Sequence, residues 1–269
     1  MTPVRATLIA AILSASVNLP ASATTIFPVE STDQLIHAIE IANQTPEADI
    51  ISMERALYVL DSVQSESQKA ALPAISSPIV IRGNGAELRR YSTQDFRLFH
   101  VTEKGHLRLE HVVLAEGSIG AIRNHGVTEL RRVALVDSTA RGASAIVENY
   151  GEMRLTDCEV SFNTVAGASR DAGTIVNWGK LWLTSTTFQG NQLSRRYEGV
   201  ALASSVLNYG TADIDDVVIA ENIAGEVGVI EGAPQAPLVN LGNGSLELRL
   251  VREHDNLPGA ALVARSLLP

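Results

Sequence analysis

Four ring-bearing residues each stand directly before a glycine in consecutive copies of an internal repeat: His125, Tyr150, Trp178 and Tyr209. If the copies stack, the rings lie ~4.8 Å apart, a spacing that suits offset aromatic stacking. Rings at an exposed turn could instead form a platform for the apolar faces of sugar rings. Both interpretations stay open. Trp182, at an outward position of the strand that follows, is a further candidate for substrate binding.

Charged residues at outward positions suggest a catalytic alternative. Asp157 and Asp216 share one offset two copies apart, which puts their backbones ~9.6 Å apart, close to the carboxylate separation of inverting glycosidases. A lyase would instead use Lys180 as a base and Arg154 to neutralise a uronate. The plainer interpretation of these charges is a solvated sheet face with cross-strand ion pairs.

Motifs for other chemistry are missing from the sequence. There is no zinc spacing, phosphate loop or nucleophile elbow, so we expect no cofactor and no metal. Asp213, Asp215 and Asp216 lie on one strand, where three acids rarely converge on Ca²⁺. The only cysteine, Cys158, falls on an inward position of the repeat. We expect it to behave as a small hydrophobic residue and not as a nucleophile.

The repeat that must position these residues is defined by six glycines: Gly105, Gly126, Gly151, Gly179, Gly210 and Gly244. An apolar residue stands four positions after every one of them, and mostly apolar residues recur seven and nine positions after. This alternation, broken once by Glu253, describes two short strands with a bend between them. Repeats of this length stack into a solenoid, because one unit cannot bury its own apolar side chains.

Asparagines mark the corners of the repeat. Twelve positions after the glycine stand Asn163, Asn191, Asn222 and Asn256, and Asn-x-Gly turns precede four of the glycines. A stacked Asn can hydrogen-bond to its copies above and below, so the first set predicts a ladder of amides. All-strand units with Asn-rich corners indicate a parallel β-helix.

The copies lengthen along the chain, from 21 residues between Gly105 and Gly126 to 34 residues between Gly210 and Gly244. The strands hardly change, so we expect the growth in loops that wall one side of the later coils. By the alignment these loops lie at 139–145, 164–173, 192–205 and 223–237.

A short amphipathic helix is expected ahead of the repeat. Ser31-Thr32-Asp33-Gln34 fits a capping box, and apolar residues follow at helical spacing until Asn43. We expect residues 24–48 to form an N-terminal helical cap, 49–256 the β-helix and 257–269 a C-terminal cap or tail.

The chain resembles the single-stranded right-handed parallel β-helices of the pectin-lyase-like superfamily, in particular bacterial secreted proteins with a CSLREA-type N-terminal region. The matching segments are Gln34–Asn43, Ala48–Ile51 and Ile81–Ala86. The resemblance implies an all-β fold. It does not fix a function, because that superfamily holds lyases, hydrolases, adhesins and proteins of no known activity. The Gly-His-Gly, Arg-x-Lys and Arg-x-Pro-x-x-Arg motifs of its enzymes are absent here.

Residues 1–23 are typical of a signal peptide: Arg5, a short apolar run and the small residues Ala21-Ser22-Ala23. We expect cleavage before Thr24, which N-terminal sequencing checks, and a periplasmic or extracellular location. The net charge of −9 argues against nucleic acid as a partner, and no later apolar stretch suits membrane insertion. The sequence therefore predicts a secreted, monomeric, noncatalytic β-helix that binds a polysaccharide, a cell-surface glycan or a surface protein. A polysaccharide lyase or glycoside hydrolase is the alternative.

Overall fold

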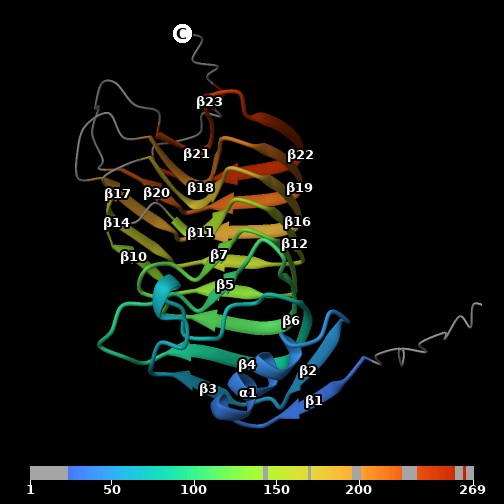
Figure 1. Cartoon of the computed structure of the whole chain (residues 1–269). Helices are drawn as coiled ribbons and strands as arrows, with labels where there is room; N and C mark the ends of the chain where they lie inside the picture. Colours follow the sequence, from blue (N-terminus) through green and yellow to red (C-terminus); the bar gives the residue numbers. More distant parts are fainter. Residues whose placement is uncertain are drawn as a thin grey trace, which may run out of the picture.

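The computed structural model is a parallel β-solenoid of about 7 turns (Figure 1). The structure describes residues 24–141, 145–168, 171–195, 201–225, 235–257 and 263–264, so the expected signal peptide lies outside the described residues. Every named strand pairs in parallel with the strand of the next coil, as in β12 with β16 and β16 with β19. The all-β solenoid that the repeat predicts is confirmed.

The longest sheet has 12 strands. They are β1 (Ile26–Val29), β2 (Asp49–Met53), β3 (Leu57–Leu60), β4 (Pro78–Arg90), β6 (His106–Ala115), β8 (Val127–Arg131), β9 (Ala134–Val136), β12 (Glu152–Thr156), β13 (Glu159–Ser161), β16 (Lys180–Gln189), β19 (Thr211–Ala220) and β22 (Ser245–His254).

Each coil of this sheet bends at one residue in the left-handed region. Its φ lies between 48° and 54° at Asn84, His111, Arg132, Asp157, Ser185, Asp216 and Leu250. None of these is glycine, although L-residues adopt this conformation at a cost. The bend between two strands was predicted. Its backbone conformation was not.

Two smaller parallel sheets close the coils. One contains β10 (Thr139–Arg141), β14 (Thr164–Ala168), β17 (Gln192–Arg195) and β20 (Ile223–Ala224). The other contains β5 (Phe99–Val101), β7 (Ile122–Asn124), β11 (Ala145–Asn149), β15 (Ala172–Asn177), β18 (Leu202–Asn208), β21 (Gln235–Asn240) and β23 (Val263–Ala264). The expected loops at 139–145, 164–173, 192–205 and 223–237 are therefore wrong in part, because both ends of each pair with neighbouring coils.

Helix α1 (Thr32–Ala42) begins at the predicted capping box. The Gln34 N–H donates to the Ser31 hydroxyl at 3.3 Å, and the Gln34 side chain accepts from the Glu30 N–H at 2.7 Å. Leu35, Ile39 and Ala42 are buried in the main core, and the helix lies against β1 to β4. The helix is confirmed. Its role as a cap stays a prediction. A 3-10 turn, η1 (Glu66–Gln68), is the one other helical element in the described chain.

Glycine recurs at the corner that leads into the long sheet because the coils approach closely there. A Cβ on Gly179 would lie 2.0 Å from the Gly151 carbonyl oxygen, and one on Gly210 would lie 2.1 Å from that of Gly179. Inside the coils, the predicted inward column of Leu and Ile is fully buried from Leu109 to Ile214. Cys158 lies in the same core, where burial raises its thiol pKa to about 11, which leaves little thiolate for nucleophilic attack.

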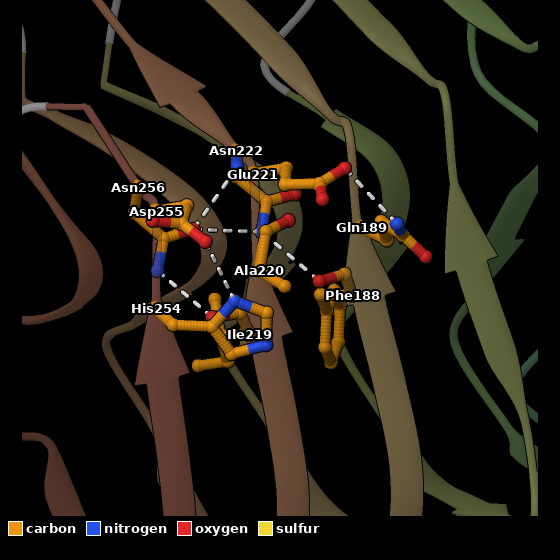
Figure 2. A network of polar contacts seen from close by, with 9 residues as sticks. All are labelled: Phe188, Gln189, Ile219, Ala220, Glu221, Asn222, His254, Asp255 and Asn256. Atoms are coloured by element: carbon orange, nitrogen blue, oxygen red, sulfur yellow. Dashed lines mark hydrogen bonds and ion pairs between the residues drawn. The ribbon is translucent and has the colours of Figure 1, made fainter.

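The predicted amide ladder is present at the corner after the long sheet. Each Nδ2 donates to the next Oδ1, at 2.9 Å from Asn163 to Asn191, 2.9 Å from Asn191 to Asn222 and 3.1 Å from Asn222 to Asn256. The same Oδ1 atoms accept the preceding rung's backbone N–H. Figure 2 shows the last two rungs, Asn222 and Asn256, together with the exposed pairs Glu221–Gln189 and His254–Asp255 on the residues next to them. Buried amides satisfied in this way stabilise the corner.

A second ladder runs through the Asn-x-Gly corner. Nδ2-to-Oδ1 bonds of 2.7 to 2.8 Å join consecutive members of the series Asn124, Asn149, Asn177, Asn208 and Asn240. The coils are thus held at two corners by side-chain amides as well as by backbone hydrogen bonds.

We predict that Asn191→Ala destabilises the protein by about 1 to 3 kcal/mol, because it removes a middle rung and leaves buried partners unpaired. Asn243→Ala, at an exposed position of the turn between β21 and β22, is the control and should change stability little. Urea titration of both variants measures the effect. Unfolding midpoints equal to that of the parent for both would show that the ladder adds nothing.

Candidate functional site

The four predicted rings form one continuous stack. Ring centroids lie 4.7 Å apart between His125 and Tyr150, 4.5 Å between Tyr150 and Trp178, and 6.0 Å between Trp178 and Tyr209, with interplanar angles of 2° to 4°. Each inner ring therefore covers the faces of its neighbours, and mainly edges remain for a ligand. Tyr150 is the most open, at 41% exposed.

The rings at both ends of the stack contact further side chains. A fifth ring, His100, meets His125 edge-on at 5.5 Å. At the other end the Tyr209 hydroxyl donates to Asp171 Oδ2 at 2.6 Å, and burial together with this carboxylate raises the pKa of Tyr209. Trp178 and Tyr209 pack on a second apolar cluster that includes Val176, Leu207 and Val239. This geometry favours a structural role for the column.

A buried charge cluster lies beside the His100 end of the stack. Glu148 Oε2 accepts from Arg97 Nη1 at 3.3 Å and from Arg123 Nε at 2.6 Å. Arg97, His100 and Glu148 are almost fully buried. Burial, followed by His125 and the two arginines, lowers the pKa of His100 to about 4. Sequence reasoning missed this cluster, although Arg123 and Glu148 share one offset in successive copies.

Lys180 and Arg154 lie on the outer face of the long sheet. Lys180 Nζ pairs with Glu152 Oε1 at 2.9 Å, and the Arg154 guanidinium lies 4.0 Å from the centroid of the Trp182 ring. Lys180, Arg154 and Trp182 are thus engaged with partners on the sheet face. These contacts lie on the sheet face and not at the bend that carries Asp157 and Asp216.

Asp157 and Asp216 occupy the left-handed bend, with Ser185 on the coil between them. Asp157 lies 3.9 Å from Arg132 Nε, while Asp216 accepts from Ser185 Oγ at 3.0 Å and from Arg252 Nη2 at 3.1 Å. Their side chains are 47% and 41% exposed. A general acid in a glycosidase is typically a carboxyl in an apolar pocket, and neither aspartate is placed that way.

Two hollows follow the bend along the solenoid axis. One, of about 560 Å³, is lined by Arg55, Asn84, Gly85, His111, Val112, Val113, Arg132 and Ala134. The other, of about 420 Å³, is lined by Arg132, Val133, Ala134, Asp157, Cys158, Glu159, Ser185 and Thr187. The two hollows share Arg132 and Ala134 in their linings and lie on the same face of the solenoid. We call the two together the axial groove. Ala134 and Thr187 are small side chains in its lining.

Comparison with protein-family models, with curated proteins and with solved structures found no match to this chain. In the described residues, no helix has the length and apolar character needed to cross a membrane. The same residues contain no group of three or more His, Cys, Asp or Glu side chains placed to hold a metal ion.

We predict that Trp178→Ala lowers stability by roughly 1 to 3 kcal/mol, because both neighbouring rings lose a stacking partner and each pair adds about 0.5 to 1.5 kcal/mol beyond burial. Trp182→Ala is the matched control. It removes one cation–π contact at a partly exposed site, worth about 0.5 to 1 kcal/mol. Thermal melting compares the two. An equal or smaller loss for Trp178→Ala would contradict a structural stack.

We predict that acid destabilises the protein partly through His100. The unfolded chain binds the proton near pH 6.5 and the folded chain near pH 4, so the free energy of unfolding falls as the pH drops through this window. The charges that face the ring are Arg97, Arg123, Glu148 and His125. The effect is at most about 3 kcal/mol.

Urea titrations at several pH values between 4 and 6.5 test whether protonation of His100 lowers the free energy of unfolding. His100→Gln should reduce the slope of stability against pH, and His106→Asn, at a half-exposed site beside Glu129, should change it less. An identical slope in His100→Gln and the parent would show that His100 is not the group responsible.

Proposed function

We propose that this protein is an exported, noncatalytic β-solenoid that binds a linear glycan along the axial groove. One observation carries the proposal: the two hollows share Arg132 and Ala134 in their linings and follow the stacked coils. A depression that repeats similar polar positions coil after coil suits a ligand that is itself a repeating chain. Polar side chains along its length supply hydrogen bonds, and the small side chains leave room for the sugar rings.

The exposure of the two aspartates and the groups beside them favour binding over catalysis. Asp157 and Asp216 are half exposed, and each has a cation or hydroxyl beside it. Acid catalysis of glycoside cleavage needs one carboxyl kept protonated by a desolvated site. The ring stack is better suited to hold coils together than to hold sugars, because its faces are covered.

The alternative, a polysaccharide lyase or glycoside hydrolase, is favoured by the shared column of Asp157 and Asp216. An activity screen on uronate and neutral polysaccharides discriminates the two. Cleavage that Asp157→Asn or Asp216→Asn abolishes would replace the binding function with an enzyme.

The relationship to pectin-lyase-like proteins with a CSLREA-type region, the right-handed single-stranded coil, the capping role of α1 and export by residues 1–23 belong to the same proposal. They are supported by the parallel solenoid, by the helix ahead of it and by the signal-peptide pattern of the sequence. A monomeric state and a surface protein as partner are further expectations from the sequence.

We predict that Ala134→Tyr lowers the affinity for a glycan identified on an array at least tenfold, because the ring fills the groove where the hollows meet. A tenfold loss is about 1.4 kcal/mol. Val127→Tyr, at an outward position of the same coil, is the matched control and should keep the affinity. Isothermal titration measures both. No glycan bound, or equal affinity in the parent and Ala134→Tyr, would overturn the groove as the binding site.

A further inference from the structure

The charge of the axial groove changes sign along the solenoid axis. The hollow nearer the N-terminal coils contains Arg55, His111 and Arg132 and no acidic side chain. The hollow nearer the C-terminal coils contains Asp157 and Glu159 beside the shared Arg132. A ligand that runs through both hollows therefore meets cations first and carboxylates next.

Arg132 Nη1 donates to His111 Nε2 at 3.0 Å, and its pairing with a carboxylate is weaker. Arg132 Nε and Asp157 Oδ2 lie 3.9 Å apart, with side chains 62% and 47% exposed. An exposed pair at this distance contributes little. Arg55 is exposed and makes no ion pair within the described chain. Both signs of charge therefore remain open to a ligand.

The charge of the groove changes from positive to negative between two adjacent coils. Arg132 and Asp157 occupy the same bend position on adjacent coils, and the Arg132 N–H donates to the Thr156 carbonyl directly before Asp157. Adjacent coils are ~4.8 Å apart, which is close to the length of one sugar unit in an extended chain. Opposite charges on neighbouring sugars would each face the complementary side chain.

We propose that the groove selects a zwitterionic polysaccharide, in which an anionic group and a protonated amine stand on neighbouring sugars. This inference rests on the proposed function. A purely anionic chain would place negative groups against Asp157 and Glu159, and a purely cationic chain would place positive groups against Arg55 and Arg132. Like charges brought together in this way cost affinity. A zwitterionic chain has little net charge, so the protein's charge of −9 does not repel it.

Three oligosaccharides of equal length test the inference by titration at low ionic strength and about pH 6, where a sugar amine is protonated. The first is N-deacetylated heparosan, with alternating glucuronate and free glucosamine. The second is the same oligosaccharide with its amines acetylated, which is anionic only. The third is a chitosan oligosaccharide, which is cationic only. The zwitterionic probe should bind at least tenfold more tightly than either of the others.

Two charge variants assign the selectivity to the groove. Asp157→Asn with Glu159→Gln should remove the preference for the zwitterionic over the anionic probe. Asn suits the left-handed backbone at position 157, and melting curves confirm folding. Arg55→Gln with Arg132→Gln should remove the preference over the cationic probe. Lys180→Gln, on the sheet face outside the groove, should leave both preferences unchanged.

The outcomes separate this inference from the proposed function. Equal or tighter binding of the acetylated or the chitosan probe, abolished by Ala134→Tyr, would overturn charge selection and leave glycan binding in the groove intact. Binding that Ala134→Tyr does not change would overturn both. Binding by none of the three probes would overturn the inference, and an array glycan that still binds in the groove would keep the proposed function.

Discussion

Parallel pairing of successive coils places every offset of the repeat in a column, so each side chain is a neighbour of its own copy ~4.8 Å away. A residue type that recurs at one offset must therefore pack against copies of itself. Asn does so twice, as the ladders from Asn163 and from Asn124 show. Aromatic rings do so by stacking, from His125 to Tyr209. Charges of opposite sign at one offset pair with each other, as Arg123 and Glu148 do.

This constraint explains how far the sequence could predict the structure. The solenoid, the ladder through Asn191 and the ring column follow from offsets alone, because a shared offset becomes a contact. Helix α1 was predicted by its capping box at Ser31. The strands β14 and β17 were assigned to loops, since they lie after the Asn corner, where the copies differ in length and the alignment loses its register.

The parts that could not be predicted depend on residues without a repeating signal. The left-handed bend falls on His111, Arg132 and Asp157, while sequence rules look for Gly or Asn at positive φ. The groove along the bend could not be predicted from the sequence for the same reason. Arg97 stands on a coil before the regular repeat begins, so nothing in the sequence joins it to Glu148, 51 residues away.

The bend also shows how the backbone turns each corner of the coil. A left-handed conformation costs a non-glycine residue roughly 1 to 2 kcal/mol, and Asn and Asp adopt it more readily than most others. Asn84 shows that Asn fits this position. Five consecutive coils carry His111, Arg132, Asp157, Ser185 and Asp216 at this position. Asp and His, like Asn, are enriched among the non-glycine residues that adopt this conformation. A second column of left-handed non-glycine residues, Glu116, Asp137, Phe162, Glu221 and Asp255, stands at the corner beside the amide ladder. Left-handed residues are therefore a general feature of the corners of this solenoid, and the case for the groove rests on its lining and on its course along the coils.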